Sequence, residues 1–372
     1  MKILKIIASG FKNCVDNFEI SYVPIARKTD VDKEYELEEV AEGLYVFSTI
    51  GVVGKNASGK TSVLDLLNVC YEILGNFRIT KKNYSLESVY LSIFFYHEGY
   101  IYRYNTLLKE DAITDKVYFE NQKILRKEYF KSNVKNIFEF DKCEKMEEDG
   151  KLPEDTSNVF FIFKKIGIPP MYYTSLDLST NAYKTAFVVQ RAFNLPENTI
   201  KKILKIFDEN ITKLEMIDEN NYLLEYNGKE EKLSDFELYY RLSSGTTKGL
   251  ALYTTVILSL RNGFDLMIDE IENHFHKTLV ENIISLYRDK TINKKNATLI
   301  FATHYCEILD LFNRQDNIYI TKTDEKVKIF NMYKDFDVRP ELLKSKQFYN
   351  NVFKTAVNYD ALMDLKKELK QK

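Results

Sequence analysis

The sequence predicts an α/β fold in which helices flank a mixed β-sheet. Three observations predict it. The apolar run from Leu44 to Val53 leads into a glycine-rich turn and then into a segment with helical periodicity. A second apolar run ends in the carboxylates Asp269 and Glu270, and a third, over 298–302, ends just before His304. Buried strands that alternate with amphipathic helices are typical of a sheet covered by helices.

The composition indicates a globular protein. An apolar content of 45% is ample for a buried core. Lys and Arg total 53 against 55 Asp and Glu, which gives a net charge of -2. This balance does not indicate a broad basic surface for nucleic acid. The four cysteines stand apart without a C-x-x-C pair, which argues against a zinc site and a disulfide framework. Without a signal peptide or a long apolar run, we expect a cytoplasmic protein that does not enter a membrane.

Periodicity predicts the other elements in order. We expect strands at 2–8 and 17–23, a helix at 60–74, a hairpin of strands at 89–96 and 100–107, helices at 182–193 and 198–207, a second hairpin at Asn227-Gly228, a helix at 250–260 and short strands at 318–321 and 327–332. The basic run at Lys123, Arg126, Lys127, Lys131 and Lys135 is interpreted as the solvated face of a helix. We predict one domain made of an N-terminal lobe (1–75) and a C-terminal lobe (237–335), with an α+β insertion (76–236) between them and a helical tail (336–372).

A complete phosphate-loop motif follows the strand at 44–53. Its residues are Gly54, Lys55, Asn56, Ala57, Ser58, Gly59, Lys60 and Thr61, and Ser62 follows directly. In the G-x-x-x-x-G-K-[ST] pattern the glycines let backbone N–H groups surround the phosphates, the lysine contacts the β/γ oxygens and the threonine hydroxyl coordinates the metal. The motif predicts an ATP site with Mg²⁺, in which Lys60 is catalytic and Thr61 is a metal ligand.

The apolar strand over 263–268 ends in a Walker B pattern. Asp269 is predicted to hold Mg²⁺, and Glu270 is predicted to be the general base that polarises the attacking water. The alternative is that both carboxylates only cap the next helix, predicted at 272–286.

Two further segments complete the candidate site. Ser243, Ser244 and Gly245 precede an apolar helix, where free N–H groups and the helix dipole favour an anion such as the γ-phosphate. The alternative for these residues is a plain helix N-cap. His304 ends the buried strand at 298–302 and is predicted to hydrogen-bond the γ-phosphate, the alternative being a structural histidine.

Together these motifs resemble ABC-type ATPases of the SMC/RecF kind, and among them the OLD-like AAA family of bacterial anti-phage defence. The resemblance rests on Ser9-Gly10-Phe11-Lys12-Asn13, on the G-x-N-x-[SA]-G-K-[ST] form of the phosphate loop, on Leu242-Ser243-Ser244-Gly245-Thr246 and on Ile268-Asp269-Glu270-Ile271-Glu272-Asn273-His274. It implies an ABC-type ATPase head, with Lys12 and Asn13 near the nucleotide. It also implies a head-to-tail dimer or higher oligomer in which the signature Ser243–Gly245 of one subunit closes on the ATP of another. Asn273 and His274 would form the loop across that interface.

The sequence departs from the family pattern at Lys277, where proline is usual. Neither Gln122 nor Gln190 has the context of the family's Q-loop.

The resemblance implies a function in regulation. The segment 62–241 is longer than a transporter subunit's helical arm, and it lacks the heptads of an SMC coiled coil. OLD nucleases carry a metal-binding Toprim domain after the ATPase, whereas 305–372 shows only short strands and a lysine-rich tail. We therefore expect an ATPase that regulates a separate effector protein, a nuclease or toxin. The alternatives are a RecF-like DNA-repair or DNA-end-binding ATPase, with DNA as partner, and an assembly scaffold with slow turnover.

Overall fold

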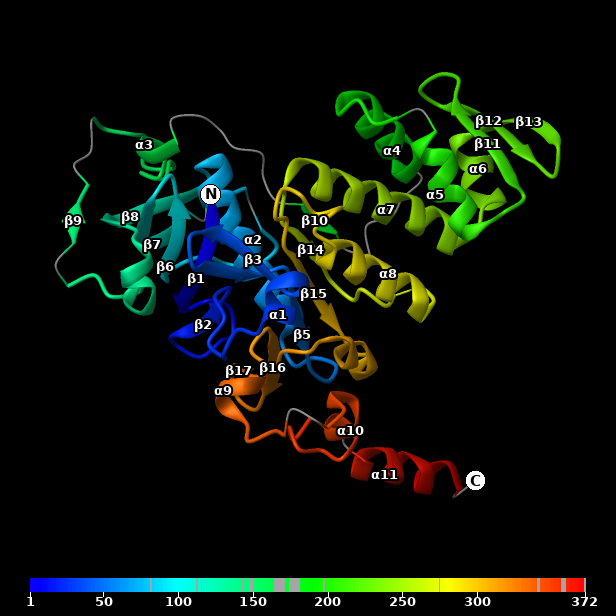
Figure 1. The fold of residues 1–372 in the computed structure, drawn as a ribbon. Helices are drawn as coiled ribbons and strands as arrows, with labels where there is room; N and C mark the ends of the chain where they lie inside the picture. The colour runs from blue at the N-terminus through cyan, green and yellow to red at the C-terminus, as the bar shows by residue number, and fades with distance from the viewer. Residues whose placement is uncertain are drawn as a thin grey trace. The chain divides into compact units, whose positions relative to one another are not determined.

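Two sheets and the helices around them organise the first part of this computed structural model, and a helical region with a small sheet forms the second (Figure 1). The structure describes residues 1–80, 82–111, 113–114, 116–141, 143–146, 150–163, 171–173, 181–196, 198–273, 275–339, 342–355 and 359–370. The chain divides into unit 1, which joins Met1–Pro170 to Ile300–Lys372, and unit 2, which is Met171–Leu299. The boundaries of these units differ from those of the predicted lobes. Strands of the predicted insertion pair with the N-terminal sheet and therefore belong to unit 1.

Unit 1 contains a six-stranded antiparallel sheet of order β2-β1-β6-β7-β8-β9. Its strands are β1 (Lys2–Ser9), β2 (Phe18–Ser21), β6 (Val89–His97), β7 (Tyr100–Asp111), β8 (Lys116–Glu128) and β9 (Glu144–Lys145). The predicted hairpin is confirmed as β6 and β7, which are joined through Glu98 and Gly99 in positive φ. Glycine and short loops of this kind match the twist of the flanking strands.

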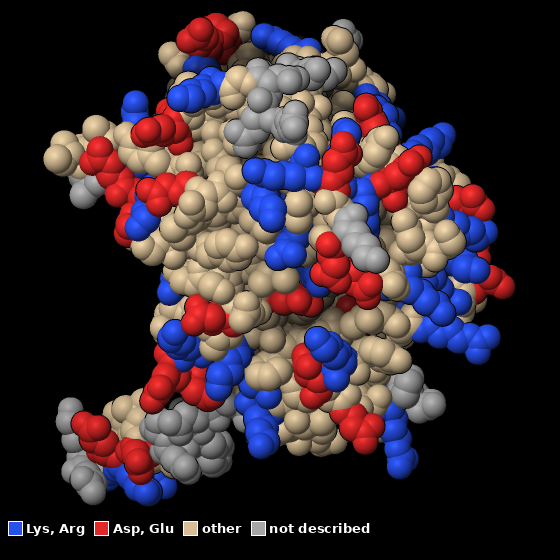
Figure 2. All heavy atoms as spheres, turned by 90° about the vertical axis from the view of Figure 1, so that its left-hand side faces the viewer, with Lys and Arg blue, Asp and Glu red and all other residues tan. Residues whose placement is uncertain are grey.

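Most of the basic run lies on this sheet, so the interpretation of the run as one helix was wrong. Lys123, Arg126 and Lys127 belong to β8, and Lys131 and Lys135 to the short 3-10 helix η1 (Lys131–Asn136). Acidic partners offset part of the charge, because Arg126 lies 2.8 Å from Glu144 and Lys131 lies 2.9 Å from Glu42. Figure 2 shows blue and red side chains interspersed over the side of the molecule that carries β8 and β9. This face therefore presents a mixed charge.

The second sheet of unit 1 carries the phosphate loop. Its strands in this unit follow the order β15-β5-β16-β17 and are β15 (Leu299–Thr303), β5 (Thr49–Val53), β16 (Ile318–Thr323) and β17 (Val327–Asn331). β5 runs parallel to β16, and β16 pairs antiparallel with β17, so the expected mixed sheet is confirmed. All five residues of β5 are buried, as expected of a strand covered on both faces.

The predicted strand at 44–53 is two strands. β4 (Leu44–Phe47) pairs with β3 (Leu37–Ala41), and after Ser48 the chain enters β5 beside β16. Ser48 donates its N–H to Glu36 O at 3.0 Å. The chain changes its pairing partner at this residue, which an uninterrupted apolar run does not reveal.

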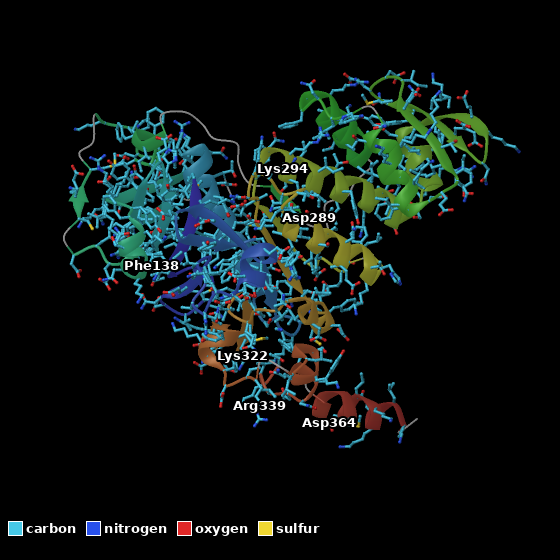
Figure 3. The ribbon with its side chains drawn as sticks, viewed as in Figure 1. Phe138, Asp289, Lys294, Lys322, Arg339 and Asp364 are labelled. Atoms are coloured by element: carbon cyan, nitrogen blue, oxygen red, sulfur yellow. The ribbon has the colours of Figure 1, made fainter. Side chains whose placement is uncertain are left out.

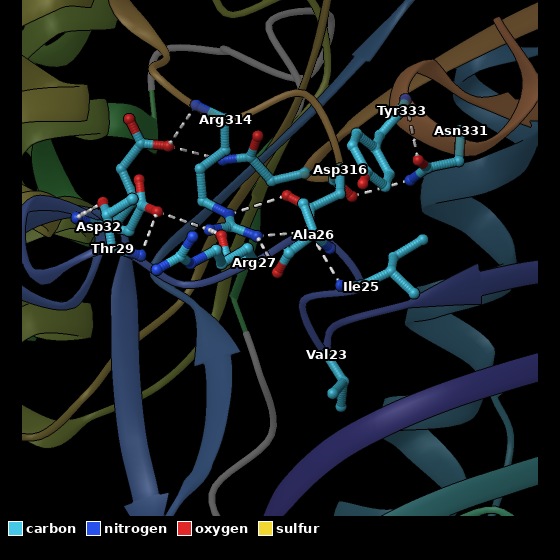
Figure 4. A network of polar contacts seen from close by, with 12 residues as sticks. Val23, Ile25, Ala26, Arg27, Thr29, Asp32, Arg314, Asp316, Asn331 and Tyr333 are labelled. Carbon is cyan, nitrogen blue, oxygen red and sulfur yellow. Dashed lines mark hydrogen bonds and ion pairs between the residues drawn. The ribbon is translucent and has the colours of Figure 1, made fainter. Parts of the chain in front are cut away.

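A buried ion network fixes the segment between β15 and β16 (Figure 4). The Arg314 side chain is 3% exposed and lies 2.6 Å from Asp316 and 2.8 Å from Asp32. Asp316 also accepts the N–H groups of Ile25 and Ala26, each at 2.8 Å. The network ends where β16 begins, so it holds in place the strand that pairs with β5.

Unit 1 is completed by helices around these sheets. They are α1 (Asp30–Tyr35), α2 (Lys60–Asn76), α3 (Phe160–Phe163), η3 (Cys306–Leu311), α9 (Met332–Asp335), α10 (Lys344–Tyr349) and α11 (Tyr359–Lys370). α2 confirms the predicted helix at 60–74, and α10 and α11 fall in the predicted helical tail. In the part of the chain that the structure describes, no helix is long and apolar enough to cross a membrane.

The described residues of unit 2 form two short parallel strands, a three-stranded antiparallel sheet and five helices. They are β10 (Met171–Tyr173), β14 (Leu266–Ile268), β11 (Ile211–Met216), β12 (Asn221–Tyr226), β13 (Lys229–Ser234), α4 (Asn181–Ala192), α5 (Thr199–Phe207), α6 (Asp235–Arg241), α7 (Ser244–Asn262) and α8 (Lys277–Arg288). The hairpin expected at Asn227-Gly228 joins β12 to β13. α5 packs closely on α7, because a Cβ at Gly249 would lie 2.1 Å from the Phe207 ring. Glycine at 249 therefore sets the spacing of these two helices.

Candidate nucleotide-binding site

The phosphate loop joins β5 to α2 and depends on glycine at two positions. A Cβ at Gly54 would lie 2.3 Å from Ser58 Oγ, and a Cβ at Gly59 would lie 2.3 Å from Val327 Cγ1. Gly59 also has a φ of 95°, which side chains rarely adopt. It is the N-cap of α2, and no side chain caps this helix. An uncapped helix N-terminus behind a tight glycine turn fits a phosphate group.

The side chain of Lys60 is held by contacts within unit 1. Its side chain is buried, and Nζ donates to the carbonyl oxygens of Gly54 at 3.0 Å and Lys55 at 3.1 Å. Nζ also lies 3.1 Å from His304 Nδ1. An ammonium group has donors but no acceptor, so Nδ1 is the acceptor in this contact. The structure thus joins two residues that the sequence places in separate motifs.

Two threonines of β16 hold the loop from the other side. Thr321 Oγ1 lies 2.7 Å from Ser58 Oγ, and Thr323 Oγ1 donates to Ala57 O at 3.2 Å. Sequence reasoning missed both residues. Their only signal is an alternating Thr-x-Thr at the end of a short apolar strand, which many surface strands share.

The predicted nucleotide residues Lys12 and Asn13 have partners within unit 1. Lys12 Nζ forms an ion pair with Asp65 of α2 and lies 3.9 Å from the centre of the Tyr84 ring. Asn13 Nδ2 donates to Glu325 O at 2.8 Å, in the turn between β16 and β17. The structure therefore ties the N-terminal motif to the helix and the hairpin that flank the phosphate loop.

The predicted Walker B carboxylates follow a buried strand in unit 2. β14 ends at Ile268, and Asp269 and Glu270 are half-buried just beyond it. Glu270 has a φ of 51°, so its backbone does not continue the extended conformation of the strand. Its Oε2 accepts from Asn273 Nδ2 at 3.2 Å, and its carbonyl accepts from Asn273 N at 2.8 Å. A left-handed residue other than glycine costs energy and is often found at functional sites. His274 lies outside the described residues.

The signature segment begins with the N-cap of α7. Ser243 caps α7, with Oγ accepting from Thr246 N at 3.0 Å. Ser244 is exposed and Gly245 is half-buried in the first turn. Thr247 Oγ1 bonds to Ser243 O at 3.2 Å and lies 2.6 Å from Tyr183 OH, which anchors the start of the helix. The first turn of α7 is thus already ordered by its own side chains.

The helix after the carboxylates begins later than expected. The prediction was 272–286, but α8 starts at Lys277, because His276 is its N-cap and accepts from Thr278 N at 3.3 Å. Lys277 occupies the first helical position, which proline also favours, and lies 3.5 Å from Glu281. Lysine at 277, where the family usually has proline, is therefore compatible with a helix that starts at this residue. Asp269 and Glu270 do not cap α8.

The two glutamines considered for the Q-loop have structural contacts. Gln122 on β8 accepts from Tyr104 OH at 2.6 Å and from Asn158 N at 2.7 Å. Gln190 on α4 donates to Pro196 O at 2.9 Å. Both side chains hold neighbouring segments of the chain together.

The structure brings part of the predicted site together within unit 1. Lys60 and His304 are in contact, and Thr61, which is exposed, and Ser62 lie in the first turn of α2. Asp269, Glu270 and the signature residues Ser243, Ser244 and Gly245 belong to unit 2. Their roles toward nucleotide and magnesium stay predictions.

Comparison with known proteins adds a family match over part of the chain. Residues 173–310 match the family model described as "AAA domain, putative AbiEii toxin, Type IV TA system". This span holds the signature, both carboxylates and His304, whereas the phosphate loop lies before it. A search of the curated proteins found no match.

Two solved structures are similar over most of the chain. One is an SMC head bound to the C-terminal winged-helix domain of ScpA, at 16% identity and a TM-score of 0.42, covering 90% of this chain and 99% of the other. The second is CbiO1 from Clostridium perfringens, part of the ABC transporter complex CbiONQ, at 14% identity and a TM-score of 0.33, covering 89% and 97%. The glycine cradle with its buried lysine and the AAA-domain match lead to one conclusion: the chain is a P-loop ATPase with an α/β fold.

Proposed function

We propose that the protein is an ABC-type ATPase that binds and hydrolyses ATP with Mg²⁺ in a head-to-tail dimer and regulates a separate effector protein in anti-phage defence. The contact of Lys60 Nζ with His304 Nδ1 carries the proposal for the site. A γ-phosphate that reaches Lys60 replaces the loop carbonyls and the imidazole as its partners. His304 then loses its donor and is released to contact the phosphate itself.

Each remaining residue has a role in this proposal. Lys12, Asn13, Gly54 to Ser62 and the signature Ser243 to Gly245 bind the nucleotide, Thr61 and Asp269 hold Mg²⁺, and Glu270 polarises the attacking water. Magnesium supplies the positive charge that offsets the charge developing on the transferred phosphoryl group. The chain's own residues position that group and the water.

Mixing two inactive variants tests the dimer. Lys60→Ala removes the lysine that contacts the β/γ-phosphates and is expected to abolish ATP binding. Ser244→Arg places a bulky cation in the exposed first turn of α7 but leaves the Ser243 cap in place, so nucleotide binding to the single chain is expected to remain. An equimolar mixture should regain part of the ATPase activity, measured as phosphate release, because one site of the mixed dimer has both halves intact.

A matched control keeps this test specific. Ser132→Arg adds the same charge at another exposed serine, in η1, and should leave turnover unchanged. Mixing Lys60→Ala with Ser132→Arg should then give no more activity than Ser132→Arg gives alone. If the Lys60→Ala and Ser244→Arg mixture stays inactive while each variant is folded, the shared site is ruled out.

The family description supports the defence role, because it names a putative toxin of a type IV toxin–antitoxin system. Capture of the tagged chain from phage-infected cells is expected to recover an effector that depends on ATP for binding, and deletion of the gene is expected to change phage sensitivity. Absence of both effects contradicts the regulatory role. Stimulation of the ATPase by duplex DNA, lost steeply as salt rises, would instead support the DNA-repair alternative.

A further inference from the structure

A small pocket lies beside the phosphate loop, on the β16–β17 hairpin of unit 1. Its volume is about 220 Å³, and Lys55, Thr321, Lys322, Thr323, Asp324, Lys328, Phe330, Lys354 and Thr355 line it. Sites for drug-sized ligands start at roughly 300 Å³. The pocket therefore fits a small group rather than an extended organic molecule.

The charges that line the pocket are mostly positive. Four of its residues are lysines and one is an aspartate, which pairs with Lys328 at 3.3 Å. Within the described ranges, no carboxylate forms an ion pair with Lys55, Lys322 or Lys354. Three cations thus face one small volume in a protein whose net charge is -2.

Lys322 is held in place by aromatic rings. Its Nζ lies 4.9 Å from the centre of the Phe330 ring and 4.8 Å from that of Phe336. Figure 3 marks the position of Lys322 in unit 1. Burial lowers the pKa of Lys322, and the nearby charge of Lys354 lowers it further. Lys354 has a φ of 51°, which costs energy in a residue other than glycine. An anion in the pocket would relieve the repulsion between these two lysines.

The pocket is separate from the cradle formed by the phosphate loop. Lys60 and Thr61 do not line it, and Lys55 is the one residue of the loop that does. On the hairpin, Val327 packs on Gly59, while Lys322 and its cross-strand partner Lys328 line the pocket. The hairpin therefore contacts the loop through some residues and forms the pocket with others.

From this cluster we propose that the pocket is a second anion site, which binds one phosphoryl or pyrophosphoryl group between Lys55, Lys322 and Lys354, with the hydroxyl of Thr355 beside it. Lysine is a common point-charge partner of phosphate oxygens, and hydroxyl donors complete the coordination of such groups. The group comes either from a free anion, such as inorganic phosphate or pyrophosphate, or from the phosphorylated end of a nucleic-acid strand.

Calorimetric titration of the full chain with pyrophosphate tests the proposal. In the Lys60→Ala background the phosphate loop is disabled, and one binding site is expected to remain. Adding Lys322→Met and Lys354→Ala should weaken that site by about tenfold for each lysine lost, the usual worth of a charged hydrogen bond. Lys322→Met keeps the aliphatic stem against the two rings. Lys326→Ala, an exposed lysine of the same hairpin that does not line the pocket, is the control and should bind as before.

The same titration of the wild-type chain gives an independent check, because two sites are expected there and one after the Lys322→Met and Lys354→Ala changes. Binding that is absent in the Lys60→Ala background, or unchanged by the two pocket substitutions, overturns the proposal. An oligonucleotide with a 5′-phosphate, compared with the same strand without it, then identifies the source of the group. None of these measurements requires hydrolysis, so they stand apart from the test of the ATPase dimer.

Discussion

Replacing Glu270 with glutamine is expected to lower ATP turnover by about 10²- to 10⁴-fold while ATP still binds, because that is the usual worth of a positioned general base. The structure makes the substitution a clean one. In the wild-type chain Asn273 Nδ2 lies 3.2 Å from Glu270 Oε2. Glutamine keeps an oxygen that can accept this hydrogen bond and has nearly the same volume as glutamate. The turn that holds residue 270 in its left-handed conformation also includes the backbone bond from Asn273 N, which the change leaves intact.

Single-turnover phosphate release and nucleotide binding, measured on the same preparation, separate the two effects. Glu281→Gln is the matched control, because Glu281 is a carboxylate of the same unit whose partner is the surface residue Lys277. It should hydrolyse ATP at the normal rate. Normal turnover in the Glu270→Gln variant would remove Glu270 from the role of base. Loss of ATP binding would point to a structural role for the carboxylate.

Replacing Arg314 with methionine is expected to cost about 3–5 kcal/mol of folding free energy, the range for breaking a buried ion pair by removing one partner. The substitution leaves the Asp316 carboxylate fully buried and that of Asp32 9% exposed, without the guanidinium that lies between them. It also removes the bonds from the guanidinium to the carbonyls of Ala26 and Arg27. The strand β16 starts beside this network, so we expect the phosphate loop to lose order as well.

Urea unfolding followed by circular dichroism measures this loss of stability. Lys131→Met is the control, because the Lys131–Glu42 pair is 66% and 76% exposed and such surface pairs contribute about 0–1 kcal/mol. Equal midpoints for the two variants would show that the network contributes no more than a surface ion pair. A drop in ATP affinity for Arg314→Met alone would link the network to the phosphate loop.

The sequence predicted an element well where a single contiguous motif contains all the residues that define that element. The phosphate loop, the helix α2 and the hairpin β6–β7 follow from contiguous patterns of glycine, apolar and polar residues. Prediction failed where pairing partners decided the outcome. The run at 44–53 divides at Ser48 between two partners, and the basic run at 123–135 is mainly a strand because β8 pairs with β7 along its length. A charge pattern does not indicate which of these pairings forms.

The start of α8 shows a similar limit. The apolar periodicity indicated a helix after Glu270, but His276 supplies the cap and the chain turns through Asn273 before it. The segment at Ser243 had two open interpretations, an anion site and a plain helix N-cap. The structure shows that the Ser243 hydroxyl caps α7. The residue patterns and the family resemblance supplied the functional interpretation in each place, and the local hydrogen bonds supplied the geometry.

The sequence by itself predicted a nucleoside-triphosphate site and determined where the loop, the carboxylates and the strand-end histidine lie along the chain. Those features are local, because each depends on residues within a few positions of one another. Only the tertiary structure decided that Lys60 meets His304 across 244 positions, that Thr321 and Thr323 hold the loop, and that three lysines from the loop, the hairpin and the C-terminal region share one pocket. Such contacts depend on which strands pair and in which register, and hydrophobic patterning specifies the buried face of a strand without naming its neighbour.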